Sequence, residues 1–508
     1  MVQKSFSMGV YGLDAFTVEV EVDISRGMPS FDIVGLPDAA VKESRNRVRS
    51  AMLNNGFKYP EQRVTINLAP ADIRKEGPVY DLPQLVALLK ATGELYVDTD
   101  DSVFMGELSL DGVVRPVRGC LPMTVHAQKS GFKRIYVPEA NAREASVVRG
   151  IEVYPVHDVK ELVACLNGNI KIDRAVFTEE DMDYTEYQPD FADVKGQEDA
   201  KRALEIAAAG GHNVLLIGPP GSGKSMLAKR IPSILPDMTF EESIETTGIH
   251  SVAGTLNVPL IRTRPFRSPH HTISANGLSG GGTVPHPGEI SLAHNGVLFL
   301  DELPEFPRTS MEILRQPLED GKVTISRVSG AVTYPCSMLL LAAMNPCPCG
   351  FFGHPTRKCT CSPVAVSRYL GKISGPLLDR IDLHIEVPPV EYAELQSTEK
   401  SESSAEIKKR VQAARDIQLK RYEGTGVTCN ANATAALIRD TAKLSEEADK
   451  LMQRAFESFG FSARTYDRVV KVARTIADLD GSEKIEAVHM AEAVQYRSLD
   501  RKYWSREL

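Results

Sequence analysis

The clearest chemical signal in the sequence is a glycine-rich segment that follows a short apolar stretch, residues 213–217. Glycines let successive backbone N–H groups turn toward phosphate oxygens, and the helix expected next adds the positive end of its dipole. The segment reads Gly218, Pro219, Pro220, Gly221, Ser222, Gly223, Lys224 and Ser225. Lys224 can reach the β- and γ-phosphates, and Ser225 can bind Mg²⁺. The pattern predicts binding of a nucleoside triphosphate such as ATP, together with Mg²⁺.

A pair of carboxylates follows a second apolar stretch, residues 296–300. Asp301 and Glu302 stand where a buried parallel strand would present acids at its carboxyl end. We expect Asp301 to hold Mg²⁺ through water, and Glu302 to orient and polarise the attacking water. A third apolar stretch, residues 338–344, should lie beside the first in such a sheet, and it ends in Asn345, whose amide would touch the γ-phosphate or that water. An isolated acid pair is usually a solvated strand end, so these roles depend on the phosphate-binding segment upstream.

The order of strand, acid pair, strand and asparagine resembles the core of AAA+ ATPases. Two arginines extend the resemblance. Arg380, in the segment 377–383, takes the place from which such subunits project a guanidinium into the ATP site of a neighbouring subunit. Arg464 begins a helical stretch, residues 465–477, and takes the place of the lid arginine that senses bound phosphate. On the residues alone, each arginine could equally form a surface ion pair.

Three longer segments resemble the magnesium-chelatase-like branch of AAA+ ATPases and, within it, the ComM/YifB family. They are residues 264–272, 288–303 and 377–383. The resemblance covers nearly the whole chain. It implies a hexameric, ATP- and Mg²⁺-dependent motor. Through the competence member of the family, it implies helicase activity that migrates branched DNA during homologous recombination in natural transformation. The implied partners are branched or single-stranded DNA and identical subunits.

Composition and length bound the function less tightly. A chain of 508 residues suits about three domains rather than one core. It shows no charged-then-apolar leader and no apolar run near the ~20 residues that span a bilayer, which predicts a cytoplasmic protein without a membrane partner. The formal net charge of −8 argues against a generally basic nucleic-acid coat, although a ring can confine its basic residues to a channel. Charge therefore leaves DNA and protein substrates open.

The expected fold class is a multidomain α/β chain. We predict an N-terminal α/β domain, a linker, a central parallel-sheet AAA+ core, and a C-terminal helical lid. Their expected ranges are 1–172, 173–190, 191–388 and 389–508.

The N-terminal domain resembles the proteolytic domain of Lon proteases over residues 71–78 and 106–138. The serine nucleophile and the lysine base of a working Lon site would fall at Val79 and Leu121. Without either group the covalent chemistry has no agent. We therefore expect an inactive Lon-like domain that forms the ring or contacts DNA.

Half of the cysteines form two Cys-x-Cys pairs just after Asn345. They are Cys347, Cys349, Cys359 and Cys361. Four thiolates at this spacing can surround Zn²⁺ tetrahedrally, and His354 in the intervening loop could replace one of them. Disulfides are the competing interpretation, which a reducing cytosol disfavours. We predict a structural zinc site that shapes the connection leaving the third apolar stretch.

A basic stretch lies between the phosphate-binding segment and the acid pair. Its candidate DNA contacts are Arg264, Arg267, His270 and His271. Such a group could bind phosphates along a ring channel without reading sequence. The alternative is that the arginines pair with acids at a subunit interface. A metal site on the paired histidines lacks an identifiable third ligand.

Three other functions stay open on the sequence. A magnesium-chelatase motor would drive insertion of Mg²⁺ into a porphyrin, but that resemblance covers only the ATPase half of the chain. A Lon-type protease is disfavoured by Val79 and Leu121. A protein-remodelling ATPase remains, because a ring channel can thread either polymer.

Overall fold

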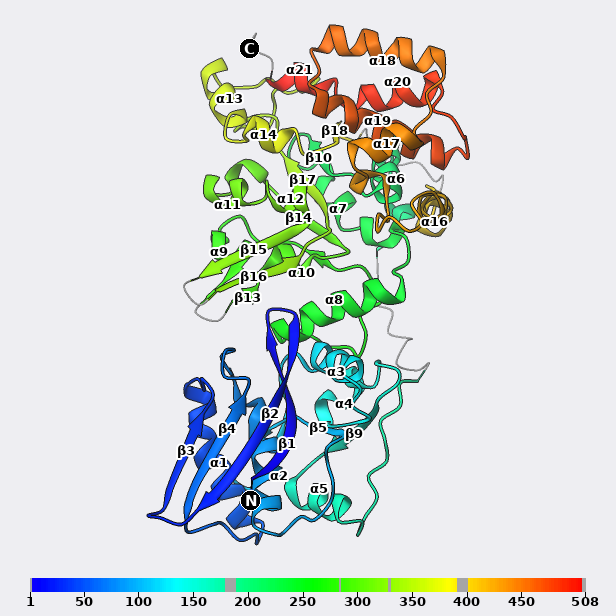
Figure 1. Ribbon diagram of the computed structural model, residues 1–508. Coiled ribbons are helices and arrows are strands. Elements are labelled where there is room, and N and C mark those ends of the chain that lie inside the picture. The colour runs from blue at the N-terminus through cyan, green and yellow to red at the C-terminus, as the bar shows by residue number, and fades with distance from the viewer. Residues whose placement is uncertain (1, 179–188, 283–284, 328–329, 391–400, 505–508) are drawn as a thin grey trace. The chain divides into compact units, whose positions relative to one another are not determined.

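The computed structural model describes residues 2–178, 189–282, 285–327, 330–390 and 401–504 (Figure 1). The chain forms two compact units. Unit 1 consists of Met1–Tyr184 with Ser243–Ile261, and unit 2 consists of Thr185–Glu242 with Arg262–Leu508. Most of the expected linker, at 179–188, lies outside the described residues.

Unit 1 is built on a seven-stranded mixed sheet of order β3-β4-β2-β1-β5-β8-β9. Its strands are β1 (Gln3–Tyr11), β2 (Asp14–Ser25), β3 (Ser30–Val34), β4 (Arg63–Ala69), β5 (Ser102–Phe104), β8 (Arg134–Pro138) and β9 (Glu152–Val156), with a separate pair β6 (Glu107–Leu108) and β7 (Val114–Arg115). Its helices are α1 (Ala39–Asn54), α2 (Asp81–Ala91), α3 (Cys120–Lys129), α4 (Glu139–Ala145) and α5 (Val159–Leu166). The mixture arises because β1 pairs antiparallel with β2 and parallel with β5.

Side-chain alternation explains the core of unit 1. Val18, Val20 and Val22 of β2 are fully buried, while the residues between them lie on the other face, as a period of two requires. Helix α2 is buried along Leu82–Leu89 and packs on both α1 and the sheet. A helix that is apolar on every side belongs inside a core.

A segment from near the middle of the chain completes unit 1. Helix α8 (Phe240–Ala253) contains the boundary, and from Ser243 onward its residues group with unit 1. The Ser251 hydroxyl donates to Glu144 at 2.7 Å, and the Gly119 N–H donates to the Ser251 carbonyl at 3.1 Å. The expected ranges assigned this segment to the ATPase core, because periodicity alone does not reveal these contacts.

Unit 2 contains a five-stranded parallel sheet of order β11-β14-β17-β10-β18. These strands are β10 (Val214–Ile217), β11 (Phe266–Arg267), β14 (Val297–Leu300), β17 (Leu339–Met344) and β18 (Leu383–Glu386). The prediction that the third apolar stretch lies beside the first is confirmed, since β10 pairs with β17 over its whole length. Two hairpin-like pairs, β12 (Gly280–Gly281) with β13 (His286–Pro287) and β15 (Lys322–Arg327) with β16 (Gly330–Pro335), stand apart from this sheet.

Helices surround the sheet of unit 2 and dominate its C-terminal part, drawn orange to red in Figure 1. The helices before residue 390 are α6 (Glu198–Gly210), α7 (Lys224–Ala228), α9 (Ala275–Ser279), α10 (Glu289–Leu292), α11 (Arg308–Ile313), α12 (Pro317–Asp320), α13 (Pro363–Leu370) and α14 (Gly375–Leu378). Those after it are α16 (Ser404–Arg421), α17 (Ala435–Thr441), α18 (Glu446–Phe459), α19 (Ala463–Leu479), α20 (Ala487–Gln495) and α21 (Leu499–Trp504). Side chains from both groups share one apolar core.

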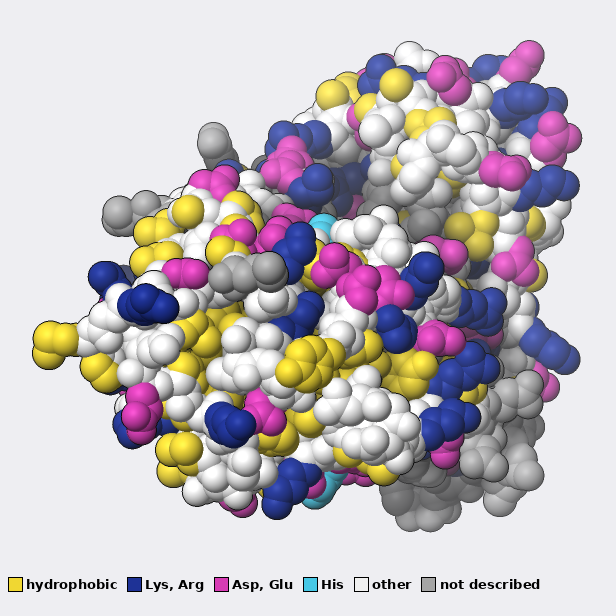
Figure 2. All heavy atoms as spheres, turned by 60° about the horizontal axis from the view of Figure 1, so that its bottom comes forward, with side chains coloured by type: hydrophobic (Ala, Val, Ile, Leu, Met, Phe, Trp, Pro, Cys, Tyr) yellow, Lys and Arg dark blue, Asp and Glu magenta, His cyan; other side chains and the backbone are white. Residues whose placement is uncertain are grey.

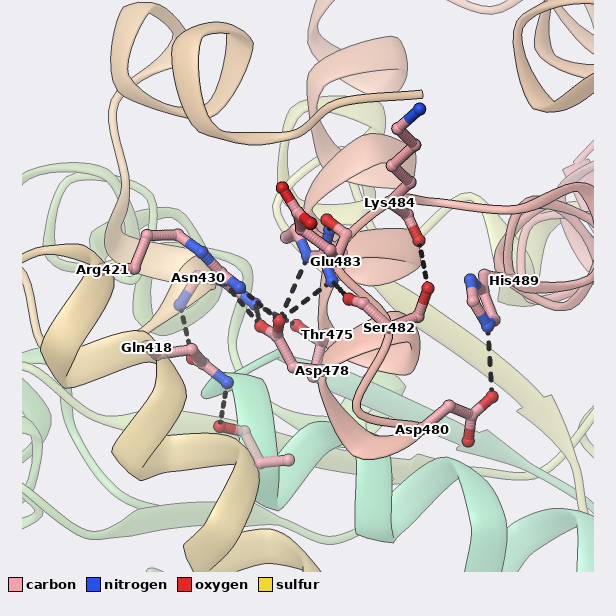
Figure 3. A network of polar contacts seen from close by, with 12 residues as sticks. Gln418, Arg421, Asn430, Thr475, Asp478, Asp480, Ser482, Glu483, Lys484 and His489 are labelled. Carbon is pink, nitrogen blue, oxygen red and sulfur yellow. Dashed lines mark hydrogen bonds and ion pairs between the residues drawn. The ribbon is translucent and has the colours of Figure 1, made fainter. Parts of the chain in front are cut away.

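A buried polar network fixes α16 against α19 (Figure 3). Asp478, near the end of α19, accepts hydrogen bonds from Arg421 at 2.8 Å and from Asn430 at 2.9 Å. Arg474, one turn earlier, is fully buried and donates to the same carboxylate at 3.1 Å. Buried charges persist only when paired, so this cluster defines one arrangement of the helices.

The surface carries mixed charge. On the face in Figure 2, lysine and arginine side chains alternate with aspartate and glutamate instead of gathering into one basic area. Within the described ranges, no helix combines the length and apolarity needed to cross a membrane.

Candidate nucleotide-binding site

The phosphate-binding segment joins β10 to α7, as its sequence predicts. Strand β10 ends at Ile217, and α7 begins at Lys224. A Cβ on Gly218 would lie 2.2 Å from the Val387 carbonyl oxygen, so this position excludes any side chain. Gly223 has φ +92°, a left-handed conformation that glycine adopts without strain. The glycines thus let the loop turn tightly beside the neighbouring strand.

Lys224 and Asn345 meet at the carboxyl edge of the sheet. Strands β10 and β17 are in register, with Ile217 opposite Met344, so the loop that follows β10 and leads to Lys224 begins at the same edge as Asn345. The Lys224 amine donates to the carbonyls of Gly218 at 2.7 Å and Pro219 at 2.9 Å, and to the Asn345 side-chain oxygen at 3.3 Å. Burial lowers the pKa of Lys224 to about 8.

Ser225 and Asp301 also come together, although they lie on different elements. The Ser225 hydroxyl donates to the Asp301 carboxylate at 2.6 Å. Asp301 follows β14, which pairs with β17 in the centre of the sheet. A hydroxyl and a carboxylate are the hard oxygen ligands that Mg²⁺ prefers. The residues present therefore fit the predicted Mg²⁺ site.

Glu302 begins a short 3₁₀ turn, Leu303–Glu305, in a left-handed conformation with φ +53°. Its side chain is 57% exposed, and one carboxylate oxygen lies 3.3 Å from Nδ1 of His271. Left-handed φ in a residue other than glycine is strained and is concentrated at functional sites. Glu302 thus stands next to Asp301 with an accessible carboxylate.

The structure corrects the interpretation of Arg264 as a DNA contact. Its side chain is only 10% exposed and donates to the carbonyls of Pro236 at 2.7 Å and Asn295 at 2.8 Å, and to Glu242 at 2.9 Å. Because its donors are already satisfied within the chain, Arg264 anchors the segment before β11.

Arg267 is likewise engaged, through two hydrogen bonds to the Glu289 carboxylate at 2.7 and 2.8 Å. The alternative interpretation, pairing with an acid, describes it better, but the acid belongs to the same chain. Of the two histidines, His270 is exposed and contacts Thr272, whereas His271 faces Glu302.

Arg380 and Arg464 converge on one carboxylate, that of Glu319 in α12. Arg380 forms a very short ion pair with it and also donates to the Pro376 carbonyl at 2.6 Å. Arg464 pairs with the other oxygen at 3.0 Å. The hydrogen bond from Arg380 holds the pKa of Glu319 below its usual range. No pattern in the sequence pointed to this acid.

These arginines lie at the edge of the sheet opposite Lys224. Arg464 and Glu319 line a cavity of about 610 Å³ together with Asn213, Met338 and Asp382. Those three residues directly precede β10, β17 and β18. A four-residue strand spans about 13 Å, so the cavity lies well away from the carboxyl edge. The structure therefore does not bring Arg464 to the phosphate-binding loop of its own chain, where the lid interpretation places it.

The four clustered thiols face one another. Their sulfurs all lie within 4.8 Å of one another, and those of Cys347, Cys349 and Cys359 are 3.4–3.7 Å apart. Tetrahedral zinc with bonds of about 2.3 Å separates its sulfurs by about 3.8 Å, so the donor set fits Zn²⁺. In the described part of the chain it is the only group of three or more potential ligand side chains close enough to share a metal ion.

The thiol cluster adjoins the phosphate-binding loop. A Cβ on Gly350, one residue after Cys349, would lie 2.4 Å from the Pro220 ring. His354 is not part of the cluster, because its Nδ1 accepts the backbone N–H groups of Thr356 and Arg357. The sequence predicted the thiols but not their contact with the loop.

In unit 1, the positions expected for Lon chemistry are apolar and buried. Val79 is 7% exposed and belongs to the main core. Leu121 is fully buried and packs with Val147 and with Leu260 from the segment 243–261.

Comparison with known proteins agrees with this geometry. The family described as magnesium chelatase, subunit ChlI, matches residues 190–395, and two related descriptions, subunit ChlI of Mg-chelatase and its C-terminal part, match 20–141 and 401–497. An uncharacterized protein YifB of Escherichia coli is 46% identical over 96% of each chain. Competence protein ComM of Haemophilus influenzae is 44% identical over 98% of this chain and 97% of its own. Lon protease 2 of Bacillus subtilis is 32% identical over 31% of each chain. Similarity at this level over nearly the full length shows that the chain belongs to the ComM/YifB family of magnesium-chelatase-like proteins.

Proposed function

We propose that the protein is a hexameric AAA+ ATPase that uses ATP hydrolysis to migrate or unwind branched DNA. The observation that carries the ATPase part is the meeting of Lys224, Asn345, Ser225 and Asp301 at one edge of a parallel sheet. Ligands of open α/β sheets bind at this edge, in the crevice outside the carboxyl ends of the strands.

Each residue of the site has a defined task in this proposal. The Lys224 ammonium exchanges its two loop carbonyls for β- and γ-phosphate oxygens. Ser225 and Asp301 hold Mg²⁺, which neutralises phosphate charge when it is bound. Glu302 orients and polarises the attacking water, and Asn345 contacts the γ-phosphate or that water. Electrostatic positioning of this kind supplies most of the catalysis in phosphoryl transfer.

The location of the arginines supports the proposed assembly into a ring. Arg380 and Arg464 share Glu319 at the edge opposite their own phosphate-binding loop. A neighbouring subunit docked there would place its γ-phosphate within their reach. Arg380 then acts as the arginine finger of the next site, and Arg464 senses the same phosphate.

The DNA part of the proposal draws on relationship. A relative named Competence protein ComM matches this chain over nearly its whole length. With Arg264 and Arg267 engaged inside the chain, His270 is the most exposed of the predicted contacts. A DNA-contacting surface is thus better sought on other residues as well, including those of unit 1.

The proposal is tested by following ATP turnover with and without single-stranded, duplex and four-way-junction DNA. Conversion of a labelled junction is measured in parallel, with Lys224→Ala as the inactive control. Stimulation by the junction, and its conversion only with hydrolysable ATP, is the expected result. Turnover that ignores every DNA would leave an ATPase and favour protein as the remodelled substrate; no turnover at all would overturn the ATPase itself.

We also propose that Cys347, Cys349, Cys359 and Cys361 hold a structural Zn²⁺ ion. The spacing of the four sulfurs supports it. Bound zinc would keep the loop around Gly350 seated against Pro220. Elemental analysis of the purified protein tests the proposal directly, with one zinc per chain expected.

A further inference from the structure

We propose that His271 is a positioning residue for Glu302, whose carboxylate it holds so that one oxygen stays free for the attacking water. The inference rests on the proposed ATP hydrolysis and deepens it. It also gives a task to a histidine that the sequence suggested as a DNA contact.

The path of the chain brings the two residues together. Strand β11 pairs in parallel with β14, with Arg267 opposite Leu298. His271 follows β11 by four residues, and Glu302 follows β14 by two. Both side chains therefore leave the sheet at the same edge. The carboxylate of Glu302 and Nδ1 of His271 lie 3.3 Å apart.

The imidazole ring is held from two sides. Its centroid lies 4.1 Å from that of His270, with the planes tilted by 34°. Its centroid also lies 6.4 Å from that of Phe306, in an edge-to-face contact, and Phe306 is itself only 4% exposed. Since Phe306 lies four residues after Glu302, the same turn that carries the carboxylate also seats the ring that contacts it.

Glu302 depends on this contact for its orientation. Its backbone N–H donates to Asp301 at 2.9 Å, which fixes the main chain but not the side chain. Within the described residues, His271 is the only side chain paired with the Glu302 carboxylate. A glutamate side chain that is more than half exposed otherwise samples many rotamers, and ordering it costs entropy.

The chemistry requires an N–H at Nδ1 of His271. In the active arrangement that N–H would donate to one carboxylate oxygen, and the other oxygen would accept a hydrogen bond from water. The distance of 3.3 Å is longer than the ~2.8 Å of a charge-assisted hydrogen bond, and catalytic contacts of this kind commonly tighten in the substrate complex. His271 gains and loses no covalent bond in this role.

Two substitutions separate the donor from the ring. His271→Phe keeps an aromatic ring beside Phe306 but removes the N–H. His271→Asn removes the ring but places an amide N–H where Nδ1 stood. We expect His271→Phe to lower kcat about tenfold with little change in the affinity for a fluorescent ATP analogue, and His271→Asn to restore most of the loss. His286→Phe and His286→Asn, at an exposed position in β13, serve as matched controls.

The outcomes distinguish this inference from the proposed function. If the wild-type protein does not hydrolyse ATP, or if Glu302→Gln turns over normally, the proposed mechanism fails first. If both behave as proposed and His271→Phe has the kcat of the wild type, the inference alone is wrong. It is equally wrong if Asn and Phe are equally slow, since the histidine would then act only by packing. Combining His271→Phe with Glu302→Gln should slow turnover no further than Glu302→Gln alone.

Discussion

Two regions of this chain resemble catalytic sites, and they differ in what surrounds their key positions. In unit 1, the Lon-like positions carry Val79 and Leu121, both enclosed by apolar side chains. In unit 2, Lys224, Asp301 and Glu302 lie at the carboxyl edge of the sheet, and their polar atoms contact Asn345, Ser225 and His271, respectively. The positions in unit 1 are part of a core, whereas those in unit 2 carry groups that can exchange their protein partners for a ligand.

The difference shows that positions which match catalytic residues of another protein can instead hold the side chains of a core. Burying an apolar side chain such as leucine stabilises a domain by roughly 1.5–3 kcal/mol, whereas burying an unpaired serine or lysine in its place would cost free energy. Unit 1 thus places stabilising apolar side chains at the two positions that match the Lon nucleophile and base. Unit 2 contains a buried amine with a lowered pKa and the strained φ of Glu302, and both features are typical of functional sites.

The strongest test breaks the open site directly. We expect Lys224→Ala to abolish ATP binding, and Glu302→Gln to bind ATP while losing at least about 100-fold in turnover. The first removes the charge that meets the phosphates, and the second removes the base but keeps the shape. Analogue binding and phosphate release measure the two effects. Normal turnover in Glu302→Gln would contradict the role of that residue.

The next test concerns the opposite edge of the sheet. Arg380→Ala should lower turnover about 100-fold while each subunit still binds ATP, because the arginine serves a neighbour. Mixing Arg380→Ala subunits with Lys224→Ala subunits should then restore part of the activity, since some interfaces combine an intact loop with an intact arginine. If mixing restores nothing although mixed rings form, the two residues act within one subunit.

Substitutions in the thiol cluster test how far the nucleotide-binding site depends on the loop that packs against it. Cys359→Ser combined with Cys361→Ser should remove the bound zinc and raise KM for ATP several-fold, because Gly350 no longer seats against Pro220. Elemental analysis and steady-state kinetics follow the two effects. Cys165→Ser, in unit 1 and outside the cluster, is the control. A zinc-free double variant with an unchanged KM would show that the contact between Gly350 and Pro220 does not affect ATP binding.

A smaller effect is expected from pH. With its pKa lowered to about 8, Lys224 is charged below that pH and loses its proton above it. ATP affinity should therefore be constant up to about pH 7 and fall by up to about tenfold per pH unit beyond 8. The fall ends where the pH reaches the higher pKa that Lys224 has in the complex with ATP. Lys224→Arg, whose guanidinium does not titrate in this range, should show no such fall. Affinity measured by titration at several pH values decides the question.

The smallest effect on activity should come from the closed site. Val79→Ser restores a hydroxyl where a Lon nucleophile would stand, yet peptidase activity on a casein substrate should stay absent, because the base is also missing. We expect a loss of about 1–3 kcal/mol in the free energy of unfolding, since the hydroxyl enters an apolar core. ATP turnover should match the wild type. Casein cleavage by this variant would overturn the view that unit 1 is inactive.

Local patterns in the sequence predicted the phosphate-binding loop, the acid pair, the asparagine and the thiol cluster. Each is contiguous or follows a recognisable strand, so local spacing carries the signal. Even the pairing of β10 with β17 followed from the order of apolar stretches. Family resemblance supplied Arg380 and Arg464, but not their environment.

The pairing of charged side chains became visible in the folded chain alone. It paired His271 with Glu302, placed Glu319 between Arg380 and Arg464, and withdrew Arg264 into the protein interior. It also joined residues 243–261 to unit 1. These contacts link residues far apart in the chain, and their free energies depend on burial and geometry that no local pattern encodes. The type of a charged residue tells which interactions its side chain can form. Its partners in the folded chain determine whether that side chain is available to bind a ligand.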